Sequence, residues 1–464
     1  MKFKEIFTEN YSVNWDFLLT ISPFSKMVNL EQNKEWHKED CWTHTLLVTQ
    51  AMEKLLKRNL IERGSENWIM CMSAAICHDL GKGETTKWSE EKNNWATKNH
   101  GVVGERITRH LFYDENIVLR EKVCYMVRHH MALHHVYDKP EKTNAAERLI
   151  KLSHGIVPLS YMILLNIADS IGSVNNIETE DSIFDKETKL TNDVSCLYCY
   201  LKPYSFINKS QLIRDFIDYN GEVINDRNNF CVYILCGFPG CGKSTYYDTF
   251  LKPKPIISRD IIRGELGIDG ATTANGKKVV GTKEEEDKVS EIFNEKMIEY
   301  CENKESFVLD NTNLKYQYRK DYLLKVMKYN PKVKIIYIEA PNYIKDCIDR
   351  RKGEIPKKVY DRMENNFDFP QLYECDELII IKQHSDGTDE THTFNGDPTS
   401  DLADDIHFVG GKDYISKSKI INDLKITRGA MILDGYDCYD SCVKYMDELI
   451  RAYENINEYG KKIN

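Results

Sequence analysis

Apolar residues in the first third of the chain recur every three or four positions, which is the spacing of amphipathic α-helices. The clearest of these runs are THTLLVTQAMEKLLKR, WIMCMSAAICHDL, EKVCYMVRHHMAL and PLSYMILLNIADSI. After residue 172 the helical spacing is lost in GSVNNIETEDSIFDKETKL, an acidic stretch typical of a linker or a surface loop. We therefore expect an all-α unit in the N-terminal part of the chain.

From Phe230 the pattern changes to short strand-like runs separated by charged helical segments, which indicates a parallel α/β sheet. The runs are FCVYIL, KPIIS, SFVLD, VKIIYIEA and ELIII. The last stretch opens with turn-forming residues and closes with a helical pattern, so we expect a small α+β region there. The predicted division is a helical domain over 1–195, a linker over 196–229, an α/β domain over 230–382 and a C-terminal accessory region over 383–464.

The composition is that of a folded multidomain protein, with 464 residues of which 41% are hydrophobic and 29% charged. No apolar stretch reaches the ~18 residues of a membrane span, and the N-terminus lacks the apolar segment of a secretory signal. Fourteen scattered cysteines are typical of free thiols in a reducing compartment, which predicts a soluble cytoplasmic protein. The net charge of −10 argues against a broad, sequence-independent nucleic-acid coat. We expect an accessory or dimerising role for the C-terminal region, which allows for a homo-oligomer.

The segment GFPGCGKS has the glycine and lysine spacing of a phosphate-binding loop. It follows the apolar run CVYIL and precedes a helical segment, which is the context that such loops require. Its glycines let backbone amides turn inward on phosphate, Lys243 can reach the β- and γ-phosphate oxygens, and Ser244 can ligate Mg²⁺. The sequence therefore predicts binding of ATP with Mg²⁺. The expected contacts are Gly237, Gly240, Gly242, Lys243, Ser244 and Thr245.

Charged residues follow the next predicted strands. Asp260 could accept the proton of an attacking hydroxyl, and Arg263, on the same helix face, could bind phosphate. The alternative is an ordinary exposed acid and base at the start of a helix. Asp310 ends the run SFVLD, where a nucleotide kinase needs an acid near its metal or acceptor. Arg350 and Arg351 suit a mobile basic lid over the phosphates, although such a charge run also fits a solvated face.

Together these residues resemble the polynucleotide 5′-kinase family of the end-healing type, over roughly 230–382. GFPGCGKST is similar to its phosphate loop, SRDIIR to its R-D-x-x-R stretch, VLDNTNLKYQYR to its D-x-T-N segment and DRRKGEIP to its lid. The resemblance implies that Asp260 is the general base and that Arg263 binds the acceptor phosphate. It also implies a catalytic lid arginine, either Arg350 or Arg351.

The N-terminal third has a chemistry of its own, since it holds ten of the thirteen histidines. His78 and Asp79 end an apolar helix just before a Leu-Gly-Lys turn, where both can bind one metal ion. His44 lies in an upstream helix, and Asp169 in a downstream apolar helix, where an unpaired buried carboxylate would be costly. These four side chains form a ligand set suited to Mn²⁺, Fe²⁺, Co²⁺, Ni²⁺ or Zn²⁺.

This H…HD…D pattern is similar to that of the HD phosphohydrolase superfamily, over roughly 30–175. His100, together with His129 or His130, falls where two-metal members carry further histidines. The resemblance implies a binuclear site with His130 as the preferred ligand and Lys82 facing the phosphate. The implied reaction is hydrolysis of a phosphoester with metal-activated water.

A metal phosphoesterase followed by such a kinase resembles the bifunctional HD–polynucleotide kinase enzymes that heal nucleic-acid ends. The resemblance implies removal of a 3′-end or 2′,3′-cyclic phosphate and phosphorylation of a 5′-hydroxyl, with a separate ligase sealing the products. RNA ends are expected over DNA ends, because a cyclic phosphate requires a 2′-hydroxyl. Two alternatives stay open: a nucleotide phosphohydrolase fused to a nucleoside or small-metabolite kinase, and an ATP-gated nucleotide sensor whose HD unit does not catalyse.

Overall fold

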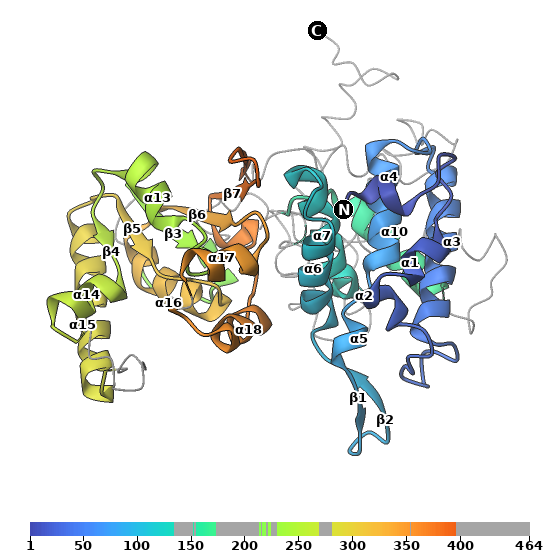
Figure 1. Ribbon diagram of the computed structural model, residues 1–464, viewed down its shortest axis with the longest axis horizontal. Helices are drawn as coiled ribbons and strands as arrows, with labels where there is room; N and C mark the ends of the chain where they lie inside the picture. Colours follow the sequence, from blue (N-terminus) through green and yellow to red (C-terminus); the bar gives the residue numbers. More distant parts are fainter. Residues whose placement is uncertain are drawn as a thin grey trace, which may run out of the picture.

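The computed structural model contains a helical unit and a unit built on a β-sheet, which lie side by side (Figure 1). Apolar side chains form a separate core in each unit. Most of the predicted linker and everything beyond residue 395 lie outside the residues that the structure describes. Those residues are 1–133, 152, 155–172, 213–214, 216–219, 221–223, 230–268, 281–352 and 354–395.

The helical unit is built on long helices whose apolar faces meet. Asp40 caps the first of them by accepting a hydrogen bond from the Thr43 amide, and Ser65 caps the second through the Trp68 amide. The second and last helices are buried along most of their length because they are apolar on all sides. The long helices are α3 (Cys41–Arg58), α4 (Glu66–Cys77), α6 (His100–Leu111), α7 (Ile117–His129) and α10 (Leu159–Ile171).

Short elements complete the helical unit. A hairpin of β1 (Thr86–Ser89) and β2 (Asn94–Thr97) projects away from the helices, between α5 and α6 (Figure 1). The remaining short helices are η1 (Phe3–Ile6), α1 (Trp15–Leu19), α2 (Ser22–Ser25), α5 (Lys82–Thr85) and η2 (His130–Ala132).

The second unit is a six-stranded sheet in the order β4-β5-β3-β6-β7-β8, parallel except for its last strand. The predicted fold class, a helical domain followed by a P-loop α/β domain with a parallel sheet, is confirmed. The strands are β3 (Cys231–Cys236), β4 (Ile256–Ile257), β5 (Phe307–Asp310), β6 (Lys332–Glu339), β7 (Glu377–Gln383) and β8 (Asp389–Asn395).

The helices of this unit connect successive strands. They are α13 (Lys243–Tyr246), the π-helical turn η4 (Tyr247–Leu251), α14 (Arg259–Glu265), α15 (Lys283–Glu302), α16 (Tyr316–Val326), η5 (Met327–Tyr329), α17 (Ile344–Arg350), α18 (Lys357–Asn365) and η6 (Leu372–Glu374). Because β8 pairs with β7, the sheet continues past residue 382, where the sequence suggested that an accessory region begins. The first residues of that predicted region therefore belong to the α/β unit.

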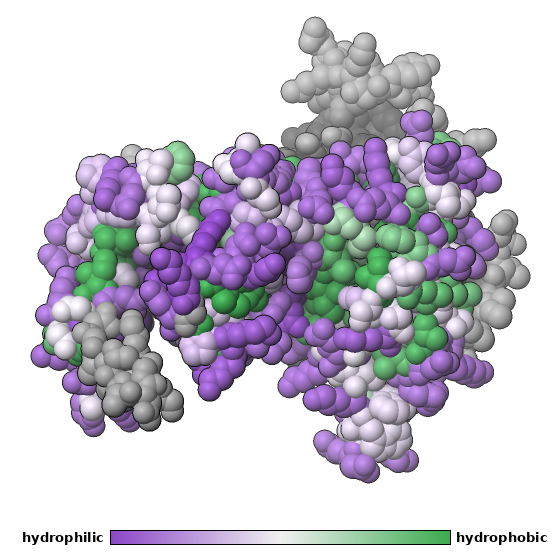
Figure 2. All heavy atoms as spheres, viewed as in Figure 1, coloured by the Kyte–Doolittle hydropathy of each residue, from purple (hydrophilic) through white to green (hydrophobic). Residues whose placement is uncertain are grey.

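Most of the surface in view on both units is hydrophilic, with a hydrophobic area on the helical unit (Figure 2). Within the described parts of the chain, no helix combines the length and the apolar character that crossing a membrane would require.

Buried ion pairs join the two units. Arg120 on α7 is fully buried and lies 2.8 Å from the Glu339 carboxylate at the end of β6. Its Nε also donates to Glu121, which in turn binds Arg109 at 2.7 Å. The Arg109 guanidinium stacks 3.5 Å from the Phe369 ring centre. These buried charges stabilise the contact between the units only as pairs, because removal of one partner leaves the other as an uncompensated buried charge.

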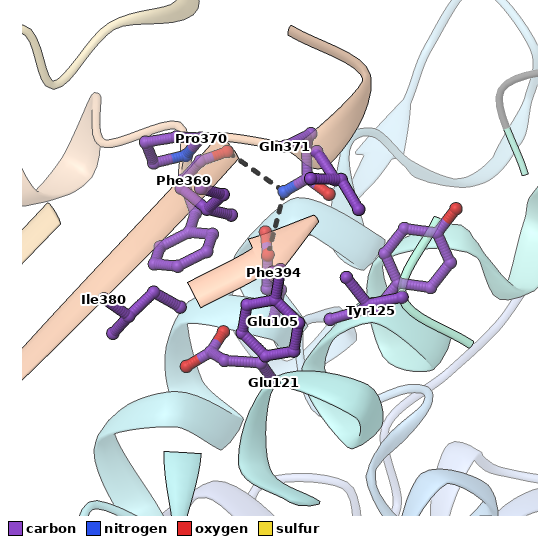
Figure 3. Close-up of a pocket in the computed structure, with 11 residues that line it drawn as sticks. Glu105, Glu121, Tyr125, Phe369, Pro370, Gln371, Ile380 and Phe394 are labelled. Carbon is purple, nitrogen blue, oxygen red and sulfur yellow. Dashed lines mark hydrogen bonds between the residues drawn. The ribbon is translucent and has the colours of Figure 1, made fainter. Parts of the chain in front are cut away.

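A small cavity lies within the same junction (Figure 3). Gln371 projects into it, and its Nε2 donates to the Phe369 carbonyl oxygen at 3.0 Å and to Glu105 at 3.3 Å. The two acids that line the cavity, Glu105 and Glu121, both bind Arg109. These acids are therefore part of the junction between the units.

We expect Arg120→Met to destabilise the protein by about 3–5 kcal/mol, because it strands the buried Glu339 carboxylate without its cation. The double variant Arg120→Met/Glu339→Gln should recover a large part of that loss, since it removes the stranded charge. Denaturant unfolding of both variants measures the effect. Lys357→Met, which breaks the exposed pair with Asp361, serves as the control and should cost below about 1 kcal/mol. Equal losses in the single and double variants would show that the stranded Glu339 carboxylate is not the cause of the loss.

Candidate active sites

Six histidine and aspartate side chains from different helices converge in the helical unit. The end of α4 supplies two of them, and the ends or first turns of α3, α6, α7 and α10 supply the others. All are buried except His100, which is partly buried. The six are His44, His78, Asp79, His100, His130 and Asp169.

The first half of this cluster lies around one oxygen of Asp79. His78 Nε2 is 3.2 Å and His44 Nε2 is 3.7 Å from Asp79 Oδ2. Asp169 Oδ1 is 2.9 Å from His44 Nε2 and 3.6 Å from His78 Nε2. Four ligand atoms that face one another at this range form the kind of pocket that one divalent ion can fill.

The second half lies around the other oxygen of Asp79. His100 Nε2 and His130 Nε2 are 3.6 Å and 3.8 Å from Oδ1, and 3.0 Å from each other. Asp79 therefore stands between two groups of potential ligands, and each of its oxygens would be available to a cation held by one group. The predicted ligands come together in two sets that share Asp79.

Backbone carbonyls fix which nitrogen each histidine turns inward. Nδ1 of His44, His78 and His130 lies within 3.0 Å of the carbonyl oxygens of Gly172, Ala75 and Val127. Because a carbonyl oxygen can only accept, each Nδ1 carries a proton, and in the neutral imidazole the lone pair of Nε2 faces the cluster. This is the second sphere that holds metal-binding imidazoles in proteins.

Electrostatics also prepare the cluster for a cation. Burial, together with His100 and His78, lowers the pKa of His130 to about 3, so this imidazole is neutral at pH 7. Burial alone would lower the pKa of His44, but hydrogen bonds to Asp169 and Glu39 raise it to about 9. Burial would raise the pKa of Asp79, but neighbouring cations hold it well below its usual range. The surrounding carboxylates attract positive charge, whether it is a proton or a metal ion.

The surroundings of the Asp79 carboxylate provide a test of the metal assignment. Both of its oxygens are buried, and Lys82 Nζ lies 2.7 Å from Oδ2, whereas His100 and His130 Nε2 are 3.6 and 3.8 Å from Oδ1. A buried carboxylate oxygen without a close cation or donor is costly, and a bound cation would offset that cost at Oδ1. The donor set, two imidazoles for each oxygen of Asp79 plus Asp169, fits divalent ions of the first transition series.

Other residues at this site had no role in the sequence interpretation. Gln32 accepts a hydrogen bond from Lys82 Nζ at 2.7 Å. His37 bonds to Glu39 at 3.0 Å, and its ring lies 4.5 Å from that of His44. The loop that leads into α3 therefore packs against one side of the cluster. The only sequence signal was a further His and Glu just before the helix cap at Asp40.

The two adjacent histidines at the end of α7 point in different directions. His130 lies in the cluster. The His129 ring instead packs between two tyrosines, with its centre 4.5 Å from that of the Tyr125 ring and 6.1 Å from that of the Tyr373 ring. Successive residues at a helix end point roughly 100° apart, so only one of them can face the cluster. The geometry thus favours His130, the residue preferred from the resemblance.

The P-loop runs from the end of β3 to the start of α13. Gly237, Gly240 and Gly242 all have positive φ angles, of 154°, 86° and 108°. A Cβ on Gly240 would lie 2.6 Å from the Cys347 carbonyl oxygen, so only glycine fits where α17 meets the loop. Lys243 Nζ donates to the carbonyl oxygens of Gly237 and Phe238, and Ser244 and Thr245 are exposed just after it.

The acids expected near the acceptor lie at the carboxyl ends of adjacent strands. Burial raises the pKa of Asp310. The positive charges of Lys243 and Arg351 oppose this rise, and the negative charge of Asp260 adds to it. The Asp260 side chain is 85% exposed and pairs with Arg263 at 2.6 Å. Arg263 also binds Glu286 on α15 through two hydrogen bonds, of 2.8 and 2.9 Å. The sequence interpretation did not foresee this acidic partner, which lies far from Arg263 in the chain.

The two arginines expected in a lid lie against the P-loop: Arg350 is the last residue of α17, and Arg351 follows it. Arg350 Nη1 donates to the Gly240 carbonyl oxygen at 3.3 Å and to Gln383 Oε1 at 2.9 Å. The Arg351 stem lies 3.2 Å from the position of a Cβ on Gly240, and its guanidinium is 3.5 Å from Glu354. Within the described residues, Arg350 is thus the lid arginine that hydrogen-bonds directly to the P-loop.

Two protein-family models match this chain. The HD domain model covers residues 41–170, and a model described as an AAA domain covers residues 232–370. A search of curated proteins gave no significant match. HD domains bind divalent metals, and P-loop domains of the kinase-like type use ATP and Mg²⁺, so each match agrees with the residues gathered in its unit. The chain contains an HD domain followed by a P-loop kinase-like domain, an order that matches the architecture of the HD–polynucleotide kinase enzymes that its sequence resembles.

Proposed function

We propose that this protein heals nucleic-acid ends with two activities. The HD domain removes a 3′-terminal or 2′,3′-cyclic phosphate, and the P-loop domain transfers phosphate from ATP to a 5′-hydroxyl. The observation that carries the proposal is that one chain holds two sets of potential metal ligands that share Asp79, and a P-loop that is bonded to Arg350 and accompanied by the exposed Asp260.

In the HD domain the cluster residues would hold the ions, with Asp79 between the two sets. When bound, divalent ions supply activated water and polarise the phosphoryl group. Lys82 Nζ lies beside Asp79 and would neutralise charge that builds up on the phosphoryl oxygens. Gln32 fixes the direction of that ammonium group through its hydrogen bond.

In the P-loop domain the backbone of the glycine-rich loop and Lys243 would cradle the ATP phosphates, with Ser244 placed for Mg²⁺. Asp260 would take the proton of the acceptor hydroxyl, and its exposure leaves room for a large acceptor. The lid arginines would stabilise the negative charge on the phosphoryl group in the transition state of its transfer. Arg263 would have to share its guanidinium between Glu286 and an acceptor phosphate.

RNA is the proposed substrate because a 2′,3′-cyclic phosphate forms only where a 2′-hydroxyl is present. The healed ends, a 3′-hydroxyl and a 5′-phosphate, are the substrates of a ligase. In this proposal a separate protein seals them, since the sequence contains no K-x-D-G nucleotidyl-transfer motif.

The test is to supply the purified protein with Mn²⁺ or Ni²⁺ and RNA oligonucleotides that end in a 2′,3′-cyclic phosphate, a 2′-phosphate or a 3′-phosphate. In parallel, [γ-³²P]ATP is supplied with oligonucleotides that carry a 5′-hydroxyl. We expect phosphate release in the first assay and label transfer in the second. Turnover of free nucleotides and nucleosides with no action on oligonucleotides would instead support the small-molecule alternative. ATP binding without turnover in either assay would support the sensor.

A further inference from the structure

A hydrogen bond from the HD domain reaches the strand end that lies beside the P-loop. The Tyr113 hydroxyl, between α6 and α7, donates to the backbone carbonyl oxygen of Gln383 at 2.6 Å. Gln383 is the last residue of β7, at the edge of the sheet where the carboxyl ends of the parallel strands and the P-loop meet. The two residues are 270 positions apart in the sequence.

The Gln383 side chain joins the lid to the P-loop. Its Oε1 accepts from Arg350 Nη1 at 2.9 Å, and the same nitrogen donates to the Gly240 carbonyl oxygen. Its Nε2 lies 2.9 Å from where a Cβ on Gly242 would be, so the amide rests directly on the loop. One carboxamide thus contacts the phosphate-binding loop and orients a lid arginine over it.

Neighbouring contacts from the HD domain hold this end of β7 in place. Lys382 is buried, donates to the Glu115 carbonyl oxygen at 2.6 Å and pairs with Glu390 at 2.9 Å. Glu390 in turn accepts a hydrogen bond from the Ile117 amide. The backbone at 382–383 is therefore fixed by the connection between α6 and α7.

We propose that Gln383 is a positioning residue for the lid arginine Arg350, and that Tyr113 of the HD domain sets its placement. The HD domain then completes the phosphoryl-transfer site as well as carrying its own cluster. The inference rests on the proposed kinase function, because it assigns Arg350 a part in that reaction. Neither residue touches the transferred phosphate in this proposal; both act through Arg350.

The test compares Tyr113→Phe and Gln383→Met with the wild type in the full chain. Tyr113→Phe removes one hydroxyl, and Gln383→Met keeps the side-chain length but cannot accept from Arg350. We expect kcat for phosphoryl transfer to fall about 3- to 10-fold in the first variant and about 10- to 100-fold in the second. KM for ATP should change less, because Lys243 and the loop amides still hold the phosphates. Phosphate release by the HD domain should stay unchanged, which also shows that each variant is folded.

A double-variant cycle separates positioning from general packing. Gln383→Met combined with Arg350→Ala should lower kcat no further than Arg350→Ala alone, since Gln383 acts through that arginine. Tyr318→Phe, an exposed tyrosine of α16, is the matched control and should leave kcat unchanged. Additive losses in the cycle, or wild-type kcat in Gln383→Met, would overturn the proposal. If the wild type transferred no phosphate to oligonucleotides, the proposed function would fail instead, and the same cycle measured on ATP hydrolysis would still test this inference.

Discussion

Replacing Asp79 with asparagine is expected to abolish phosphate release by the HD domain while leaving phosphoryl transfer intact. Asp79 offers an oxygen to each half of the cluster, so the change weakens both halves at once. Loss of residues that merely support metal ligands costs 10- to 100-fold, so losing a shared ligand should cost at least ~100-fold. The measurements are phosphate release from a cyclic-phosphate oligonucleotide and metal content by mass spectrometry after dialysis.

His110→Ala is the control for that experiment, because His110 lies on the same helix as His100 but is exposed and outside the cluster. It should retain both bound metal and activity. If Asp79→Asn kept its metal and its activity, the two-set cluster could not be the hydrolytic centre. If Asp79→Asn lost kinase activity as well, the substitution would have disturbed the contact between the two units, and the two activities could not be treated as separate.

The reciprocal result is expected for Lys243→Ala, which should lose phosphoryl transfer about 100- to 1000-fold and keep its phosphoesterase activity. Lys243 lies against the P-loop carbonyl oxygens at the start of α13, where its ammonium group can swing to the β- and γ-phosphates. The loop conformation depends on its glycines, so removal of the lysine takes away charge while the loop stays in place. Label transfer from ATP to a 5′-hydroxyl oligonucleotide measures the effect.

Lys252→Ala, which removes an exposed lysine paired with Asp248, is the matched control and should transfer label like the wild type. Phosphate release from the cyclic end, measured on the same preparation, checks that the chain is folded. Normal label transfer by Lys243→Ala would remove the P-loop from the mechanism and with it the kinase half of the proposal.

The strands and helices that frame both sites could be predicted from the sequence because their apolar spacing is regular. The cluster was predictable for a different reason. His44, His78 and Asp169 lie on three helices, and helical spacing alone does not say which helix ends meet; the resemblance to the HD superfamily supplied that arrangement. The P-loop could be predicted without helical spacing and without a family resemblance, because all of its phosphate-binding residues lie in one continuous segment.

What could not be predicted depends on contacts between distant segments. The pairing of Arg263 with Glu286 spans 23 positions of the chain, and the bond from Tyr113 to Gln383 spans 270. The partner of Arg120 is equally remote. No local period or motif encodes such pairs. The strand β8 was missed because its alternation of polar and apolar residues is weak, and only its pairing with β7 defines it.

The ion pairs between the two units decide how this protein can be taken apart. A fragment that ended before β3 would expose the buried guanidinium of Arg120 to solvent. One that began there would expose Glu339 and Lys382 on a surface that packs against the helical unit in the intact chain. Activities assigned from separate halves would therefore describe damaged pieces. Point variants of the intact chain are the sound way to silence one activity and observe the other.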